Sequence, residues 1–264
     1  MTYKLLPSHW TERIKHWSKL QPPLVPSIDT QIKIKDLVGT NTENVLLLGV
    51  TRQLAELFPN LTAIDRQPEI IEHLWIGDTD TRKAIEDNWL TYPFKINSYS
   101  AIIGDGSINM VEYPINVSTM FYRCEQILCD GGVFAVKFFT RPMKPITKDD
   151  LMNVIEGHIK INPCAFNRMI VAYNAEITGT PSVPNKSILE TLELLVTDVD
   201  KLIENTGWDK DFYLARYESY RKSQLVTNIP NREELLKLAP KYSYFVESEG
   251  YDYSENTPIL TFTK

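Results

Sequence analysis

Apolar and polar residues alternate along the chain in a pattern that predicts strands separated by helices. Val45–Leu48, Leu61–Ile64 and Ala101–Ile103 are short apolar runs, which are typical of strands buried on both faces of a sheet. Residues 51–58 and 68–74 lie between these runs and have the apolar spacing of helices. A regular succession of strands and helices favours a parallel, doubly wound sheet.

The clearest helical pattern covers residues 117–128, where apolar side chains recur every three or four positions. The glycine pair at 131–132 is expected to stop this helix. Residues 133–139 then read as a strongly apolar strand, and residues 242–246 and 259–262 as two more strands. We therefore predict an α/β fold with a Rossmann-like, mostly parallel sheet.

Changes in the hydrophobic pattern and in the spacing of prolines divide the chain into four segments. Trp10 and Trp17 lie seven positions apart, as on one face of an amphipathic helix, and we weigh two roles for it: a helix packed on the main domain, or a lid over a cleft. A later segment is mostly helical and broken by prolines, which is typical of a cap. The expected segments are an N-terminal helical arm (1–40), a ligand-binding core (41–146), a cap with the substrate region (147–240) and final strands that complete the core sheet (241–264).

Charge and hydropathy limit the classes of partner. The formal net charge is −6 without a long basic stretch, so we expect a small neutral or cationic substrate and no nucleic acid. No apolar run approaches the roughly 20 residues that span a bilayer, and the start lacks a signal-peptide stretch, which predicts a cytoplasmic protein with no membrane partner. The cysteines and histidines have no metal-ligand spacing, so no metal is expected.

Residues suited to ligand binding lie where the predicted strands end, and doubly wound sheets bind their ligands at these ends. A glycine turn lets a ligand approach the backbone, a carboxylate can accept both hydroxyls of a ribose, and a polar loop can bond the remaining edges. The three groups are Gly49-Val50-Thr51, Asp65, and Gly104-Asp105-Gly106-Ser107.

The loop after the first strand reads LGVTRQL and lacks the GxGxxG that a dinucleotide pyrophosphate requires. A nucleoside without phosphates, such as S-adenosylmethionine (SAM), makes weaker demands on this turn, so the loop favours SAM over NAD. Two alternatives need no ligand: Gly49 can simply form a tight turn, and Asp65 can cap the next helix.

The stretches VLLLGVT, LTAIDRQPEII, DNWLTYPF, SAIIGDGSINM and CDGGVFAVKFFTRP resemble class I SAM-dependent methyltransferases, specifically a bacterial group with a variant first motif. The resemblance extends over nearly the whole chain and implies SAM as the cofactor. It implies that Gly49, Val50 and Thr51 contact the methionine end of SAM and that Asp65 contacts the ribose.

The same resemblance implies that Asn88 and Trp89 contact the adenine. This position is commonly acidic in the family, so a role for Asp87 instead of Asn88 stays open. The loop from Asp105 to Ser107 is implied to face the transferred group. Arg66, Gly104 and Gly106 complete the set that we expect around the cofactor.

Methyl transfer from a sulfonium needs an aligned nucleophile and the exclusion of water, and a base only where the nucleophile must lose a proton. Our catalytic candidates are Asp105, Tyr220 and Arg141, with Tyr220 and Arg141 on the substrate side. Lys137 lies in an apolar strand and therefore needs a partner or a cleft.

The predicted function is transfer of the SAM methyl group to a small molecule. One alternative is a SAM enzyme that reacts at the aminocarboxypropyl carbon, by group transfer or cyclisation, and releases methylthioadenosine. A second alternative is a non-catalytic module that binds a nucleotide, SAM or NAD.

Overall fold

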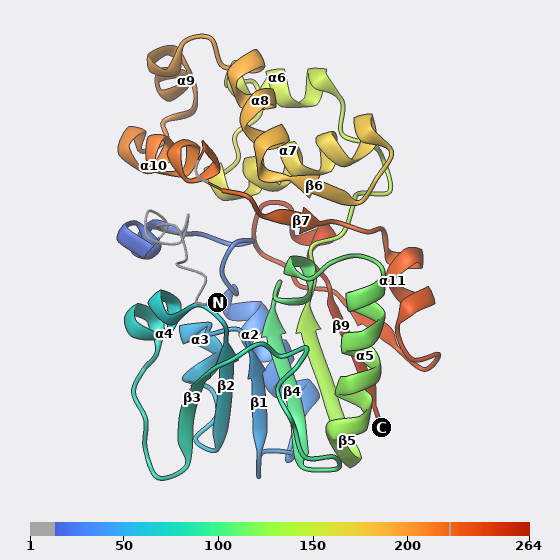
Figure 1. The fold of residues 1–264 in the computed structure, drawn as a ribbon. Coiled ribbons are helices and arrows are strands. Elements are labelled where there is room, and N and C mark those ends of the chain that lie inside the picture. The colour runs from blue at the N-terminus through green and yellow to red at the C-terminus, as the bar shows by residue number, and fades with distance from the viewer. Residues whose placement is uncertain (1–13, 222) are drawn as a thin grey trace, which may run out of the picture.

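The centre of the protein is a seven-stranded sheet with the order β3-β2-β1-β4-β5-β9-β8 (Figure 1). A computed structural model describes residues 14–221 and 223–264. Strands β1 to β5 are parallel to one another, whereas β9 is antiparallel to both β5 and β8. The strands are β1 (Val45–Leu48), β2 (Leu61–Asp65), β3 (Arg82–Glu86), β4 (Tyr99–Asp105), β5 (Leu128–Lys137), β8 (Tyr244–Val246) and β9 (Ile259–Thr263).

Helices cover both faces of the sheet, because the central strands bury apolar side chains on both sides. One apolar cluster joins the sheet to α2 (Ile28–Val38), α3 (Arg52–Ala55) and α4 (Pro68–Leu74). The other joins it to α5 (Ile115–Ile127) and α11 (Arg232–Leu238).

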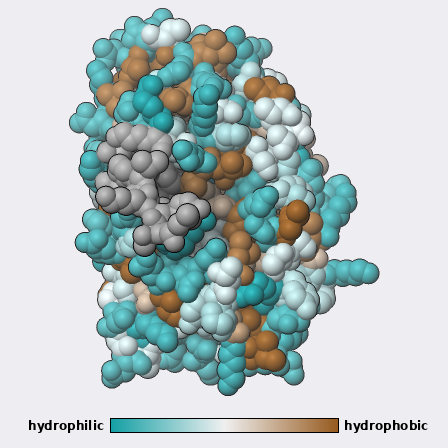
Figure 2. Space-filling view, in the orientation of Figure 1, coloured by the Kyte–Doolittle hydropathy of each residue, from teal (hydrophilic) through white to brown (hydrophobic). Residues whose placement is uncertain are grey.

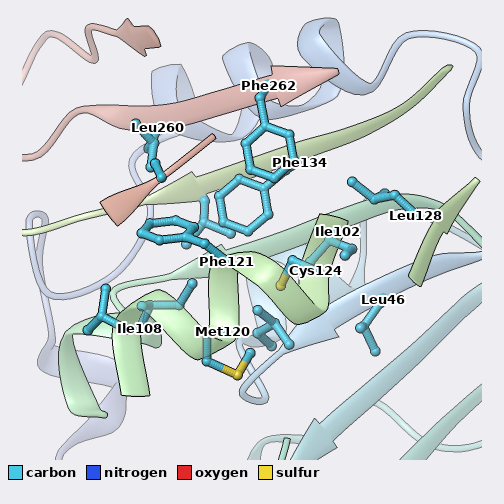
Figure 3. Close-up of a cluster of buried hydrophobic side chains, with 14 of the residues drawn as sticks. Leu46, Ile102, Ile108, Met120, Phe121, Cys124, Leu128, Phe134, Leu260 and Phe262 are labelled. Atoms are coloured by element: carbon cyan, nitrogen blue, oxygen red, sulfur yellow. The ribbon is translucent and has the colours of Figure 1, made fainter. Parts of the chain in front are cut away.

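Figure 3 shows the second cluster, in which Phe134 of β5 and Phe262 of β9 stack with ring centroids 4.7 Å apart. Phe121 of α5 packs edge-on against Phe134, with the centroids 5.8 Å apart. This layer fixes β9 beside β5, so the antiparallel strand is an integral part of the core.

A helical cap lies over the carboxyl ends of the parallel strands (Figure 1). It has an apolar core of its own, built around Phe166, Ile170 and Trp208. The small sheet of β6 and β7 lies at its base, where β7 contacts η2 of the core. The cap contains α6 (Lys148–Ile155), α7 (Pro163–Thr178), β6 (Ser182–Pro184), α8 (Asn185–Leu195), α9 (Val199–Thr206), α10 (Lys210–Arg221) and β7 (Val226–Asn228).

Short 3-10 turns complete the chain. They are η1 (Trp17–Lys19), η2 (Ile108–Met110) and η3 (Ser254–Asn256). Figure 2 shows that hydrophilic side chains cover most of one face and that its apolar patches are small and separate. Among the residues described, no helix is both long and apolar enough to cross a membrane.

The predicted α/β fold with a doubly wound sheet is confirmed, and the differences are local. The glycine pair at 131–132 does not end a helix but lies inside β5, beside a shift in the pairing of β4 with β5. The apolar residues from Leu189 to Leu202 have the spacing of one helix, but they are divided between α8 and α9, because Asp198 caps α9 by accepting the Lys201 N–H at 3.0 Å.

Two of the four expected segments, the arm and the cap, each contain a helix that packs against the core sheet. Residues 1–40 include α2, whose Ile34 and Val38 are fully buried against the sheet, so α2 belongs to the core. At the other end of the cap, α11 packs against the sheet through Leu235. The predicted helix face of Trp10 and Trp17 lies partly outside the described residues, since Trp10 belongs to 1–13.

Candidate functional site

A cavity of about 330 Å³ lies at the carboxyl ends of β1, β2 and β4, between the sheet and the cap. Every residue that we predict around the cofactor, except Gly104, lines it. The predicted residues in its wall are Gly49, Val50, Thr51, Asp65, Arg66, Asn88, Trp89, Asp105, Gly106 and Ser107.

Two further groups of residues close the cavity. Trp17, Leu20 and Leu24 come from the segment before α2, and Arg168 and Arg216 come from the cap. Trp17 therefore lies where the lid hypothesis requires, on the cavity wall. Enclosure by elements outside the core is what excludes water from a small-molecule site.

Gly49 forms the floor of the cavity. Its φ of +80° is a left-handed conformation that favours glycine, and it lets β1 turn sharply into α3. A Cβ added here would lie 3.5 Å from Trp89 Cζ3, 3.7 Å from Asp65 Oδ2 and 3.7 Å from Ser107 Cβ. Three of the expected ligand contacts thus converge on the space above this glycine.

Gly104 supports the site from below. A Cβ at this position would lie 2.6 Å from Ser107 Oγ and 3.3 Å from the Leu48 carbonyl oxygen, so a larger residue would displace the Ser107 side chain. Gly106 is constrained in the same way, by the ring of Phe139. The sequence Gly104-Asp105-Gly106-Ser107 is therefore the sequence of a tightly packed turn that presents Asp105 and Ser107.

Asp65 organises the neighbouring loops through both carboxylate oxygens. Oδ2 accepts the N–H of Val50 at 3.0 Å, and Oδ1 accepts the N–H of Gln67 at 2.9 Å. Burial raises the pKa of Asp65, while these backbone bonds and Arg66 oppose the rise. Each oxygen keeps a free lone pair, so the carboxylate can accept two ribose hydroxyls in addition. The N-cap of α4 is Gln67, not Asp65.

Of the two alternatives at the adenine position, Asn88 is the one that lines the cavity. The Asp87 carboxylate accepts the backbone N–H of Asn88 at 2.6 Å. Asn88 Oδ1 accepts the N–H of Leu90 at 3.0 Å, which holds the amide at the start of the turn that carries Trp89.

Asp105 pairs with Lys137 at the ends of β4 and β5. Nζ of Lys137 and Oδ1 of Asp105 are 2.5 Å apart, and their side chains are 0% and 5% exposed. Burial raises the pKa of Asp105, and the Lys137 ammonium opposes the rise. Lys137 also donates to the carbonyl oxygens of Pro23 at 2.7 Å and Val25 at 3.4 Å. Lys137 lies in an apolar strand and needs polar partners. These partners are Asp105 and two backbone carbonyl oxygens of the segment before α2.

Several polar atoms of the cavity wall are buried without a hydrogen-bond partner among the described residues. They are Trp17 Nε1, Gln67 Oε1, Ser107 Oγ and Arg168 Nε. Buried polar groups are nearly always hydrogen-bonded, so an accumulation of unsatisfied donors and acceptors around one cavity indicates a polar ligand.

The structure places Tyr220 and Arg141 away from the cavity wall, contrary to our expectation for the substrate side. Tyr220 is 2% exposed, and its hydroxyl accepts from Asn167 Nδ2 and from Arg216 Nη2, the latter at 3.2 Å. Arg141 donates to both carboxylate oxygens of Glu234 at 2.9 Å. This ion pair connects the segment after β5, which carries Arg141, to α11, which carries Glu234.

Arg168 and Arg216 were not among the site residues predicted from the sequence. Asn167 and Arg168 interrupt the apolar stretch AFNRMIVAY, which becomes the buried helix α7. Two adjacent polar residues in such a helix need partners, and this was the available signal. It could not show which cavity they face.

The sequence has no close relatives among the proteins compared: no family model and no curated protein matches it. Solved structures do match. A 1,6-didemethyltoxoflavin N1-methyltransferase from Burkholderia thailandensis, with 1,6-didemethyltoxoflavin and S-adenosylhomocysteine bound, is 10% identical over 97% of this chain and 85% of that chain, with a TM-score of 0.51.

Two other solved structures also match over most of their length. A Rhodobacter sphaeroides protein assigned to the zinc-dependent alcohol dehydrogenases is 12% identical over 97% of this chain and 96% of that chain, with a TM-score of 0.55. A Methanococcus maripaludis protein assigned to the SAM-dependent methyltransferases is 14% identical over 97% and 93%, with a TM-score of 0.48. At these identities the matches concern the fold alone.

The sheet topology distinguishes a methyltransferase-type core from a dinucleotide-binding one. The dinucleotide fold continues its parallel strands in the order 3-2-1-4-5-6. Here the strand beside β5 is β9, which is antiparallel and is followed by β8 at the edge. The chain therefore has the Rossmann-like fold of the class I SAM-dependent methyltransferases.

Proposed function

We propose that this protein binds SAM in the cavity at the strand ends and transfers its methyl group to a small molecule. The observation that carries the proposal is the convergence of Gly49, Asp65 and the Asp105–Ser107 turn on one cavity between the sheet and the cap. The methyltransferase-type sheet places these three groups at the ends of neighbouring strands. The bound S-adenosylhomocysteine of the Burkholderia thailandensis methyltransferase supports the same choice of ligand.

The cavity residues suggest how the cofactor would be held. Asp65 would accept the ribose hydroxyls, and Asn88 and Trp89 would contact the adenine. The turn at Gly49 would approach the methionine portion, and the buried Ser107 hydroxyl would gain the partner that it lacks. SAM, when bound, supplies a methyl group that is already electrophilic because it is attached to a sulfonium.

The contribution of the protein is then chiefly alignment and the exclusion of water. Trp17 and Leu24 close the cavity from one side, and the cap closes it from the other. Asp105 belongs to the loop expected to face the transferred group, and Lys137 holds its carboxylate in place. An acceptor that must lose a proton could deliver it to Asp105, whose raised pKa favours taking up a proton.

Isothermal titration with S-adenosylhomocysteine, SAM and NAD tests the cofactor assignment. We expect saturable binding of the two sulfur ligands at micromolar concentrations, about −8 kcal/mol. NAD should bind at least 100-fold more weakly, because the single-glycine turn does not accommodate a pyrophosphate. Tighter binding of NAD than of S-adenosylhomocysteine would overturn the proposal.

A further inference from the structure

Two arginines of the cap line the cavity without a carboxylate partner among the described residues. Arg168 lies on α7 and is 6% exposed, and Arg216 lies on α10 and is half-buried. Four of the described arginines pair with carboxylates, among them Arg141 with Glu234 and Arg232 with Glu247. Arg168 differs from the other arginines that lack such a partner because its side chain is almost fully buried, and this burial needs a physical reason.

The observed partners of the two guanidinium groups are neutral. Nη2 of Arg168 donates to Asn167 Oδ1 at 2.8 Å, and Nη2 of Arg216 donates to the same oxygen at 3.3 Å. Arg216 also donates to the Tyr220 hydroxyl at 3.2 Å. One amide oxygen and one hydroxyl hold the two cations in place but leave most of their N–H donors, including Arg168 Nε, unused.

Arg168 remains charged at neutral pH. Burial lowers the pKa of Arg168 to about 10, with Tyr220 opposing the shift and the like charge of Arg216 adding to it. A buried cation beside a second, half-buried cation of like charge destabilises the site unless an anion joins them. The carboxylates nearby do not serve, since Asp105 is paired with Lys137, and Glu112 is exposed and bonded to Asn116 at 3.2 Å.

The arginine pair lies beside the expected transfer position. The guanidinium carbon of Arg168 is 4.5 Å from the centre of the Phe139 ring. The same ring packs against Gly106, next to Asp105. Both arginines nevertheless come from the cap, whereas the expected cofactor contacts come from the strand ends of the core.

We propose that Arg168 and Arg216 bind an anionic group, a carboxylate or a phosphate, on the molecule that accepts the methyl group. This inference rests on the proposed function and adds the chemical class of the acceptor. It reverses the expectation of a neutral or cationic substrate, which followed from the net charge of −6. That charge describes the whole surface, while the cap side of the cavity is locally positive.

The experiment is an anion titration at saturating S-adenosylhomocysteine. Thermal unfolding is followed with increasing inorganic phosphate or acetate at constant ionic strength, in the wild type, Arg168→Met and Arg216→Met. Arg52→Met is the matched control, because Arg52 is 61% exposed and pairs with Glu56 on the surface. We expect the anion to raise the midpoint in the wild type and the control. The apparent dissociation constant for the anion should rise about tenfold or more in both cavity variants.

The outcomes separate the inference from its alternatives. A stronger response to phosphate than to acetate indicates a phosphorylated acceptor, and the reverse indicates a carboxylate. No anion effect in the wild type, or equal effects in all variants, overturns the inference. Arg216→Met alters a half-buried side chain and still tests the pair should Arg168→Met fail to fold; Arg168→Lys keeps the charge and should show an intermediate affinity.

The carboxylate of the cofactor is the competing occupant of the arginine pair. Titration with S-adenosylhomocysteine and with methylthioadenosine, which lacks the amino acid portion, decides this point. We expect Arg168→Met to bind both within about twofold of the wild type. Selective loss of S-adenosylhomocysteine binding would assign the pair to the cofactor and overturn the inference. Failure of the wild type to bind S-adenosylhomocysteine would instead overturn the proposed function, while anion titration without it would still report on the pair.

Discussion

Buried ionisable side chains determine the chemistry of the cavity, and each depends on its neighbours in a different way. Asp65 keeps its carboxylate near the ligand space through two backbone N–H groups. Lys137 offsets the charge of Asp105. Arg168 lies over an aromatic ring with only a neutral oxygen as its partner. Burial is costly for all of them, which is typical of groups retained for binding or catalysis.

For Asp65, we predict that binding and stability change in opposite directions. Asp65→Ala and Asp65→Asn should weaken S-adenosylhomocysteine by about 1.5–3 kcal/mol, the scale of a charge-assisted hydrogen bond. Because burial raises the pKa of Asp65, the protonated carboxyl stabilises the fold at low pH and this contribution is lost as pH rises through the folded-state pKa. At neutral pH, Asp65→Asn should therefore be at least as stable as the wild type.

Calorimetry and thermal unfolding at pH 7 measure the two effects in the same samples. Asp87→Asn is the matched control, because its carboxylate bonds only to the neighbouring backbone and does not line the cavity. Unchanged affinity in a folded Asp65→Ala protein would remove Asp65 from the ribose site.

At the scale of elements, the segment between η1 and α2 joins the core and the cap. The carbonyl oxygens of Pro23 and Val25 accept from Lys137 in the core. From the cap, Asn162 Nδ2 donates to the Pro22 carbonyl at 3.0 Å. Asn162 also caps α7, the helix that carries Arg168. The segment thus acts as a strap across the cavity, with Trp17 and Leu24 as its apolar contacts.

Two truncations test this strap. Removal of residues 1–26 keeps α2, so we expect a folded protein that binds S-adenosylhomocysteine at least about tenfold more weakly, since part of the cavity wall is lost. Removal of residues 1–39 also deletes Ile34 and Val38, which are fully buried, and should give an unfolded or insoluble protein. Circular dichroism and calorimetry measure both results.

Trp17→Ala provides a milder variant for the same test. It removes one apolar side of the cavity and leaves the Lys137 contacts in place. We expect a stable fold with weaker ligand binding. A shortened protein that starts at Ser27 and binds the ligand as tightly as the full chain would exclude a lid role for the segment.

At the scale of the whole molecule, the sheet and the cap contribute different residues to the site. The strand ends provide the expected cofactor contacts, and the cap provides the arginine pair on the opposite side of the same cavity. The cap has its own apolar core, so its cavity-facing residues can differ without disturbing the sheet. We therefore expect acceptor specificity to depend on the cap.

The coproduct of the reaction tests the chemistry of the molecule as a whole. The methyl carbon is the least hindered carbon on the sulfonium, so an aligned acceptor should attack it in preference to the aminocarboxypropyl carbon. Incubation with SAM and a panel of small carboxylates and phosphates should yield S-adenosylhomocysteine, detected by mass spectrometry. Neutral analogues of the same compounds are the control. Accumulation of methylthioadenosine would show that the other carbon reacts.

Much of the core could be predicted from the sequence, because short apolar runs between amphipathic segments are compatible with few folds other than a sheet covered by helices. Val45–Leu48 and Pro68–Leu74 were predicted with the bounds that the structure shows. Once the runs are parallel strands, their carboxyl ends meet at one edge, and Gly49, Asp65 and Asp105 come together without further information. The candidate cofactor site is therefore largely a consequence of local pattern and topology.

The substrate side was decided by tertiary structure alone. An amphipathic pattern shows which face of a helix is buried but not what it is buried against. Tyr220 and Arg141 looked equally suited to grip a ligand, yet the hydroxyl of one positions Arg216 and the guanidinium of the other meets Glu234. Arg168 faces the cavity because α7 packs over the end of β5, a long-range contact that no local sequence pattern encodes.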